Sequence, residues 1–311
     1  MAFFAVAVGV FLLIKGGDWL LHSAVSLSLR FSIPKIVIGM TVVSFATSAP
    51  ELIVSIQSAM SGHPDLALGN VVGSNIANLG LVLAITIMIS PIDVTSSFYK
   101  TDWPMMMLAS LLFYFFIVVD NKLVAYEGAI LFVFLLFFLV YLIKYQKEAV
   151  LDEAPDDDEV LSMSKTMTYF LLGAFSLWLG SETLIKGAVS LAEDLGVSER
   201  IISVSIISVG TSIPELSASV VAIINKEKAI SLGNLIGSNI FNILAVMGIT
   251  SMIHPIELQD TGFLNNDIWW MLGISFLILP LVFFPKGSRL GWIDGLVLMV
   301  LYIFFIFPLF V

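Results

Sequence analysis

The sequence contains no cysteine, few charged residues and only three histidines, and each shortage excludes a class of protein. Without cysteine, the 311-residue chain has neither a disulfide nor a thiolate metal site. His22, His63 and His254 do not share the spacing of helical metal ligands, which argues against a zinc enzyme. Charged residues make up 12% of the chain and hydrophobic residues 59%, whereas soluble domains carry about 25% charge. The composition therefore predicts an integral membrane protein.

The net charge of −10 argues against nucleic acid as a partner and is concentrated in one segment. That segment, residues 144–165, carries seven acidic residues, and six of them lie close together, namely Asp152, Glu153, Asp156, Asp157, Asp158 and Glu159. It lacks the spacing and the sixth-position glycine of an EF-hand loop. A block of like charges predicts a solvated linker, and a weak cation sensor is the alternative.

Hydrophobic runs predict how often the chain crosses the membrane, because a spanning helix needs about 20 apolar residues. Ten runs come close to that length or exceed it, at residues 2–29, 33–60, 66–89, 103–119, 123–143, 166–193, 199–224, 229–252, 266–284 and 290–310. The first run has no basic leader and no clear cleavage site, so we interpret it as a retained span and not as a signal peptide.

Basic residues predict the orientation of these spans. If the N-terminus lies outside, ten basic residues fall on the inner side and two, Lys122 and Arg200, on the outer side. The inner ones are Arg30, Lys35, Lys100, Lys144, Lys147, Lys165, Lys226, Lys228, Lys286 and Arg289. This positive-inside bias predicts a multi-pass plasma-membrane protein with both termini outside and the acidic linker in the cytoplasm.

The chain contains the same polar motifs twice, 164 residues apart. Residues 47–51 read Thr-Ser-Ala-Pro-Glu and residues 211–215 read Thr-Ser-Ile-Pro-Glu. Residues 69–78 and 233–242 share the pattern Gly-Asn-x-x-Gly-Ser-Asn-Ile-x-Asn. We therefore divide the chain into two five-helix repeats joined by the linker, at residues 1–143, 144–165 and 166–311. Because five is odd, the second repeat enters the membrane inverted, as in many secondary transporters. The alternative is an old duplication without working symmetry.

Each repeat places one carboxylate in an apolar segment. Glu51 is the only charge between Ile36 and Met60, and Glu215 has the same isolation in the second repeat. Intramembrane acids are costly and mark functional sites, so the pair predicts a cation site at the junction of the repeats. A structural hydrogen bond is the alternative.

A proline precedes each glutamate and predicts a helix break. Pro50 and Pro214 cannot donate a backbone hydrogen bond, which frees carbonyl groups in the preceding turn, near Ser44–Thr47 and Ser208–Thr211. Four hydroxyl residues share the helix face of the nearer glutamate, namely Thr47 and Ser48 in the first repeat and Thr211 and Ser212 in the second.

The third and eighth predicted helices add further oxygen ligands. Ser74 and Asn78 share one helix face, as do Ser238 and Asn242. Further amides are supplied by Asn70, Asn75, Asn234 and Asn239, and close helix approach by Gly69, Gly73, Gly233 and Gly237. Oxygen ligands of these kinds bind hard cations such as Ca²⁺. Plain helix packing is the alternative. For Asp18 and Glu182, which are also duplicated, we expect a gate or helix-contact role.

These paired motifs resemble the two alpha repeats of the calcium/cation antiporter superfamily, and most of all the prokaryotic sodium/calcium exchangers. The resemblance covers nearly the whole chain and places the alpha repeats at 39–80 and 203–244. It implies that Glu51 and Glu215 are the main calcium ligands, that Thr47 and Thr211 contribute backbone oxygens, and that six neighbours form sodium sites. Those neighbours are Ser48, Ser74, Asn78, Ser212, Ser238 and Asn242. The carbonyls of Ser44 and Ser208 match further ligand positions, and the first and sixth helices would slide across a fixed core.

The chain departs from the family pattern at Asn242, where such exchangers often carry an aspartate. Two carboxylates are then left where three are usual, which leaves another coupling ion open.

The resulting prediction is a cofactor-free secondary antiporter, not an enzyme, that exchanges Na⁺ for Ca²⁺ across the lipid bilayer. A proton-coupled or K⁺-dependent exchanger on the same fold is the first alternative and a passive cation channel is the second. The oligomeric state stays open.

Overall fold

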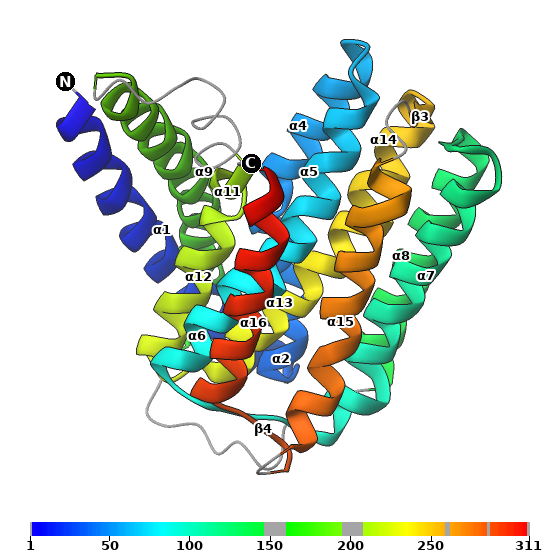
Figure 1. Cartoon of the computed structure of the whole chain (residues 1–311). Helices are drawn as coiled ribbons and strands as arrows, with labels where there is room; N and C mark the ends of the chain where they lie inside the picture. Colours follow the sequence, from blue (N-terminus) through cyan, green and yellow to red (C-terminus); the bar gives the residue numbers. More distant parts are fainter. Residues whose placement is uncertain (1, 146–159, 195–207, 259–261, 285–286, 310–311) are drawn as a thin grey trace. The chain divides into compact units, whose positions relative to one another are not determined.

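The computed structural model describes residues 2–145, 160–194, 208–258, 262–284 and 287–309, and it is helical almost throughout (Figure 1). The all-α prediction is therefore confirmed. Most of the predicted acidic linker, and residues 199–207 of the predicted seventh span, lie outside the described residues.

The elements of the first half follow one another with short connections. They are α1 (Ala2–Phe31), α2 (Lys35–Ile38), η1 (Gly39–Val43), α3 (Ser44–Thr47), α4 (Ala49–Met60), α5 (Pro64–Ala77), η2 (Asn78–Leu83), α6 (Ala84–Ile89), β1 (Ile92–Asp93), η3 (Phe98–Asp102), α7 (Trp103–Asp120), β2 (Lys122–Leu123) and α8 (Ala125–Tyr145). The η elements of this half are π-helical segments.

The second half contains corresponding elements. They are α9 (Met163–Asp194), α11 (Ser208–Gly210), α12 (Ile213–Ile224), α13 (Lys228–Phe241), η6 (Asn242–Met247), α14 (Gly248–Ile253), β3 (Ile256–Glu257), η7 (Phe263–Asp267), α15 (Ile268–Phe283), β4 (Arg289–Leu290), α16 (Trp292–Ile306) and the 3₁₀ turn η8 (Phe307–Leu309). From α4 to β1, each element recurs 164 residues later with the same bounds, as α12 to β3. The sequence repeat is thus also a repeat of secondary structure.

Six described helices are long and apolar enough to cross a membrane, and a seventh is added if one bent pair counts as a span. The six are Ala2–Phe31, Pro64–Ile89, Phe98–Asp120, Ala125–Lys144, Lys228–Ile253 and Phe263–Phe283. The bent pair is Lys35–Thr47 with Ala49–Met60, which meet at 44°. Shorter apolar helices cover Ile213–Ile224 and Trp292–Ile306. The count of ten spans stays a prediction.

The chain divides into two compact units, and each draws on both halves of the sequence. The first unit contains Met1–Thr47, Tyr141–Leu235 and Ile306–Val311. The second contains Ser48–Val140 and Ile236–Phe305.

In the first unit, α1 and α9 lie side by side along their length because glycines let their backbones touch (Figure 1). A Cβ on Gly16 would lie 2.8 Å from Leu177 N, and one on Gly173 would lie 2.7 Å from Leu20 N. A side chain at either position would collide with the main chain of the facing helix, so only glycine permits this spacing. A hydrogen bond of 3.0 Å between the Ser26 and Thr166 hydroxyls joins the ends of the two helices.

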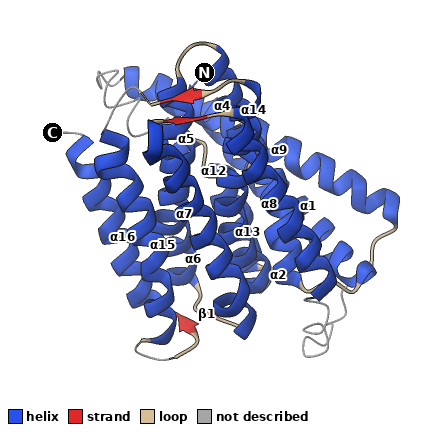
Figure 2. Ribbon diagram, turned by 90° about the vertical axis from the view of Figure 1, so that its right-hand side faces the viewer, coloured by secondary structure: helices blue, strands red, loops and turns tan. Residues whose placement is uncertain are grey.

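In the second unit, two short antiparallel ladders join the halves of the chain. β1 pairs with β4 and β2 pairs with β3, at opposite ends of the unit (Figures 1 and 2). Between the ladders, large side chains such as Phe98, Met106 and Phe113 are fully buried. The ladders fix the ends of α7 and α15, whose methionines reach the polar cluster described below.

Polar and apolar side chains are distributed in the reverse of a soluble protein. Large apolar side chains such as Phe11, Phe115 and Phe137 are exposed, whereas serines, asparagines and both Glu51 and Glu215 are buried. An extended exposed apolar surface around a polar interior is what a bilayer environment requires, because lipid solvates apolar groups and does not solvate polar ones.

Candidate cation site

The second predicted helix of each repeat is broken just before its glutamate. Ser48 and Ser212 have the same backbone angles, φ −88° and ψ 4°, and each is followed by a 12-residue helix with proline in its first turn. The breaks predicted from Pro50 and Pro214 are therefore present at matching positions.

Both glutamates are completely buried, at 0% exposure. Glu51 lies in the first turn of α4, and Glu215 lies in the first turn of α12. The positive end of a helix dipole stabilises a nearby carboxylate by about 0.3–1 kcal/mol. That gain offsets only part of the cost of burying a charge, so each glutamate is kept in its buried position at a cost in stability.

One freed carbonyl is already satisfied within the first unit. Pro214 removes the intrahelical donor for the carbonyl of Gly210, and the Ser181 hydroxyl of α9 donates to that oxygen at 2.9 Å. The sequence did not predict this role of Ser181, because Ser181 and Gly210 are 29 residues apart and no motif connects them.

The first unit also holds a chain of hydrogen bonds centred on Asn234. Its side-chain oxygen accepts from the Thr47 hydroxyl at 3.2 Å, and its Nδ2 donates to the Ser219 hydroxyl at 3.1 Å. The Ser44 hydroxyl lies 2.9 Å from the Asn234 carbonyl oxygen and 2.8 Å from that of Gly39, and it can donate to either. The side chains of Ser44 and Thr47 thus act inside the protein, which agrees with a ligand role only for their backbone oxygens.

In the second unit, Asn70 repeats the role of Asn234. Its Nδ2 lies 3.0 Å from the Ser55 hydroxyl and 3.2 Å from the backbone oxygen of Glu51, so it holds α5 against the turn that carries the glutamate.

Four buried asparagines form a second cluster in this unit, two from each half of the chain. Asn78 Nδ2 donates to Asn239 Oδ1, and Asn242 Nδ2 donates to Asn75 Oδ1, both at 3.1 Å. Among the described residues, no donor reaches the Oδ1 atoms of Asn78 and Asn242. Two buried amide oxygens are therefore available to a cation.

The structure distributes the twelve predicted site residues over both units. Six lie in the first unit, namely Ser44, Thr47, Ser208, Thr211, Ser212 and Glu215. Six lie in the second, namely Ser48, Glu51, Ser74, Asn78, Ser238 and Asn242. Ten of them are buried, Thr211 is half-buried, and Ser208 begins α11. Within the described residues, no group of three or more His, Asp or Glu side chains could hold a metal ion, so hydroxyl, amide and carbonyl oxygens have to complete any shell.

Asp18 and Glu182, expected to act as gate or contact residues, are partly exposed at 35% and 47%. Each faces a basic residue one turn along its own helix: Asp18 lies 3.5 Å from His22, and Glu182 lies 2.8 Å from Lys186. These contacts within one helix do not by themselves indicate a gate.

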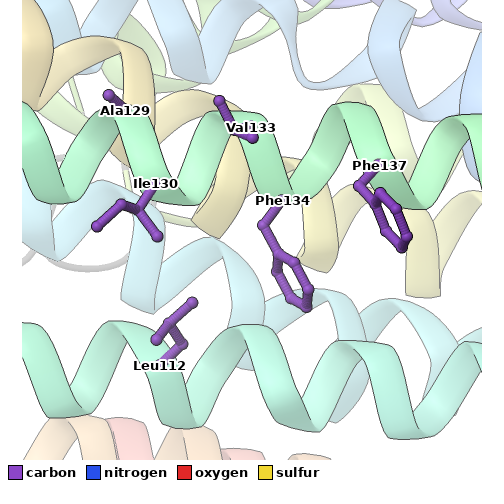
Figure 3. Close-up of a pocket in the computed structure, with 6 residues that line it drawn as sticks. All are labelled: Leu112, Ala129, Ile130, Val133, Phe134 and Phe137. Atoms are coloured by element: carbon purple, nitrogen blue, oxygen red, sulfur yellow. The ribbon is translucent and has the colours of Figure 1, made fainter.

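A hollow of about 440 Å³ on the second unit is not a cation site. It lies between α7 and α8, where Leu112, Ile130 and Phe134 point into the space between the helices (Figure 3). Its lining is completed by Ala129, Val133 and Phe137, so it offers a cation no oxygen ligand.

A comparison of the chain with known proteins agrees with the cation-binding chemistry that the duplicated polar clusters indicate. A family model described as sodium/calcium exchanger protein matches residues 1–144 and 165–311. The chain belongs to the sodium/calcium exchanger family. The match omits residues 145–164, which nearly coincide with the predicted linker of this exchanger.

Individual relatives cover the exchanger almost completely. CaxA of Alkalimonas amylolytica is 35% identical over 317 aligned residues, which cover 98% of this chain and 97% of CaxA. The sodium/calcium exchanger MaX1 of Methanosarcina acetivorans is 28% identical over 99% of this chain and 98% of its own. A solved structure of the sodium-calcium exchanger NCX_Mj, soaked without Na⁺ and Ca²⁺, superposes with a TM-score of 0.83 at 26% identity, covering 99% and 98% of the two chains. The predicted family and the transport class are therefore confirmed.

Proposed function

We propose that this exchanger moves Ca²⁺ across the membrane in exchange for Na⁺ by alternating access, with Glu51 and Glu215 as its principal cation ligands. The observation that carries the proposal is the complete burial of one glutamate per repeat, in the first turn after a matching helix break. A completely buried acid at such a position costs stability unless it has a task that requires its charge.

The surrounding chemistry supports cation binding. Ca²⁺ takes 6–8 oxygen ligands in a flexible shell. The second unit supplies oxygens of this kind from Glu51, Asn78 and Asn242, and the first unit supplies them from Glu215 and the hydroxyl and backbone oxygens of its own segment. Two carboxylates carry a formal charge of −2, which one Ca²⁺ or two monovalent cations neutralise. Competition of the two ions for the same oxygens is the simplest basis for antiport.

Asn242 favours a second candidate, a proton-coupled or K⁺-dependent exchanger. Its amide acts as a hydrogen-bond donor to Asn75, a role that an ionised aspartate cannot fill. With two acids instead of three, the coupling ion has to be tested directly.

We further propose ten membrane spans in two inverted repeats, with both termini outside the plasma membrane. The two β ladders support this topology. β1 pairs with β4, and both lie in loops that the basic residues place inside. β2 pairs with β3, and both lie in loops placed outside. An odd number of spans per repeat is what makes β1 and β3, which correspond in sequence, fall on opposite sides.

The test is uptake of ⁴⁵Ca²⁺ into proteoliposomes that contain the purified exchanger and are loaded with Na⁺. Parallel vesicles carry a pH gradient or a K⁺ gradient without Na⁺. We expect uptake that requires internal Na⁺, and we expect Glu51→Gln and Glu215→Gln each to abolish it, because the neutral amide removes half of the formal charge.

Asp93→Asn is the matched control, since Asp93 is an exposed acid of β1 that lies 3.5 Å from the exposed Arg289. Na⁺-driven uptake that survives Glu51→Gln would disprove the ligand assignment. Uptake that follows the pH gradient and does not depend on Na⁺ would show that protons, and not Na⁺, are the coupling ion.

A further inference from the structure

Asn75 and Asn239 use every hydrogen-bonding group of their side chains. Asn75 Nδ2 lies 3.3 Å from the backbone oxygen of Asn239 and 3.8 Å from Met271 Sδ. Asn239 Nδ2 lies 3.2 Å from the backbone oxygen of Asn75 and 4.0 Å from Met106 Sδ. Each Oδ1 accepts from one of the other two asparagines.

This pattern fixes which way the two amides point. If the amide of Asn75 were turned over, its oxygen would face the Asn239 carbonyl oxygen and a thioether sulfur, and its NH₂ group would face the NH₂ of Asn242. Every contact would then pair two acceptors or two donors. All four side chains are at most 1% exposed, so water cannot compensate for the loss. The same argument applies to Asn239 and Asn78.

A fixed acceptor at Asn75 determines the orientation of Asn242. The NH₂ group of Asn242 has to face Asn75 Oδ1, and its own Oδ1 then points away from the pair. Asn78 is oriented in the same way by Asn239. These outward Oδ1 atoms are the two for which no donor is found among the described residues. Buried acceptors of this kind are normally satisfied, so a missing partner indicates a ligand.

We propose that Asn75 and Asn239 are positioning residues that turn the side-chain oxygens of Asn78 and Asn242 toward the transported cation. The inference rests on the proposed function, and it adds two residues that do not themselves touch the ion. It also gives Asn242 a reason to be an asparagine, because an aspartate there would set a carboxylate oxygen against Asn75 Oδ1.

The test measures the KM for Ca²⁺ and the maximal rate of ⁴⁵Ca²⁺ uptake for the full chain in proteoliposomes. Asn75→Leu keeps the volume of the side chain and removes the acceptor, so the Asn242 amide can turn its NH₂ group toward the ion. Loss of a group that orients a metal ligand costs about 10–100-fold in metal affinity, and we expect the KM to rise about tenfold.

A double-mutant cycle separates positioning from packing. An aspartate at 242 presents an oxygen whichever way it turns, so Asn75→Leu should change the KM less than threefold in an Asn242→Asp background. An equal rise in both backgrounds would show that Asn75 acts only by packing and would overturn the proposal.

The mirror variant Asn239→Leu acts on Asn78 and carries the same test if Asn75→Leu is not monodisperse on size exclusion. Thr86→Val is the packing control, because the buried Thr86 hydroxyl donates only to Leu83 of its own helix among the described residues. If the wild type exchanges normally and the KM is unchanged in both Asn75→Leu and Asn239→Leu, the positioning role is refuted and the proposed function still stands. Absence of Ca²⁺ uptake by the wild type would instead remove the proposed function and this inference with it.

Discussion

Glycines that look equivalent in the duplicated motif should respond very differently to substitution by alanine. Gly69 and Gly233 occupy the same motif position, and Gly73 follows four residues after Gly69. In the first unit, a Cβ on Gly233 would meet the backbone oxygen of Ile36 and would lie 3.1 Å from Met40 N. In the second unit, a Cβ on Gly69 would lie 3.3 Å from the far end of the Phe263 ring. No described atom lies within 4 Å of a Cβ on Gly73.

These contacts set the size of each effect. Alanine in a helix interior gains about 0.5–1 kcal/mol over glycine. At Gly233, the new methyl group presses on main chain that cannot rotate away, and overpacking costs about 1–3 kcal/mol. We expect Gly233→Ala to lose about 1–2 kcal/mol in total. Gly69→Ala should be nearly neutral because an aromatic ring edge can shift, and Gly73→Ala should keep the helical gain.

Thermal unfolding of the purified exchanger in one detergent, followed by intrinsic tryptophan fluorescence, measures the order of the three variants. Gly233→Ala should lower the Tm by several degrees, and Gly73→Ala should leave it unchanged or raise it. A Gly233→Ala protein as stable as the wild type would show that α2 and α13 do not touch through main chain. A Tm lower for Gly73→Ala than for Gly233→Ala would show that crowding around the added Cβ does not determine the loss of stability.

Two further predictions concern polar contacts within the first unit. Ser181→Ala leaves the buried carbonyl of Gly210 without its donor, which should cost about 1–3 kcal/mol and lower the Tm. Ser181→Thr retains the hydroxyl and should lose less stability. Equal losses in the two variants would show that the hydrogen bond is unimportant. Glu227→Gln removes the partner of Lys35, whose Nζ lies 2.7 Å from the carboxylate in a largely buried pair, so we expect a lower Tm. Adding Lys35→Met to the same protein should partly restore the Tm, because the lone buried ammonium group is what costs stability. A double variant with no restored Tm would contradict that account.

Local features of the site could be predicted from the sequence because they depend on chemistry that acts over a few residues. A proline removes its own hydrogen bond wherever it stands, so Pro50 and Pro214 predicted the breaks at Ser48 and Ser212. A lone acid in an apolar run is unusual in any fold, so Glu51 and Glu215 could be predicted as candidate ligands without coordinates. The offset of 164 residues predicted which elements correspond, and the secondary structure repeats with that offset.

Contacts between distant residues needed the structure. The motif presents six asparagines and four glycines as two equal sets, and neither composition nor spacing distinguishes an amide that binds a cation from one that orients its neighbour. Asn75 and Asn239 take the second role because each faces a backbone carbonyl that lies 164 residues away in the chain. Likewise, Gly233 is crowded and Gly73 is open because of what packs beside them. The sequence alone determined where the chain bends and where it buries charge, since those are properties of one segment. Which oxygen is left for an ion depends on the geometry of hydrogen bonds between segments, and only the tertiary structure decides that.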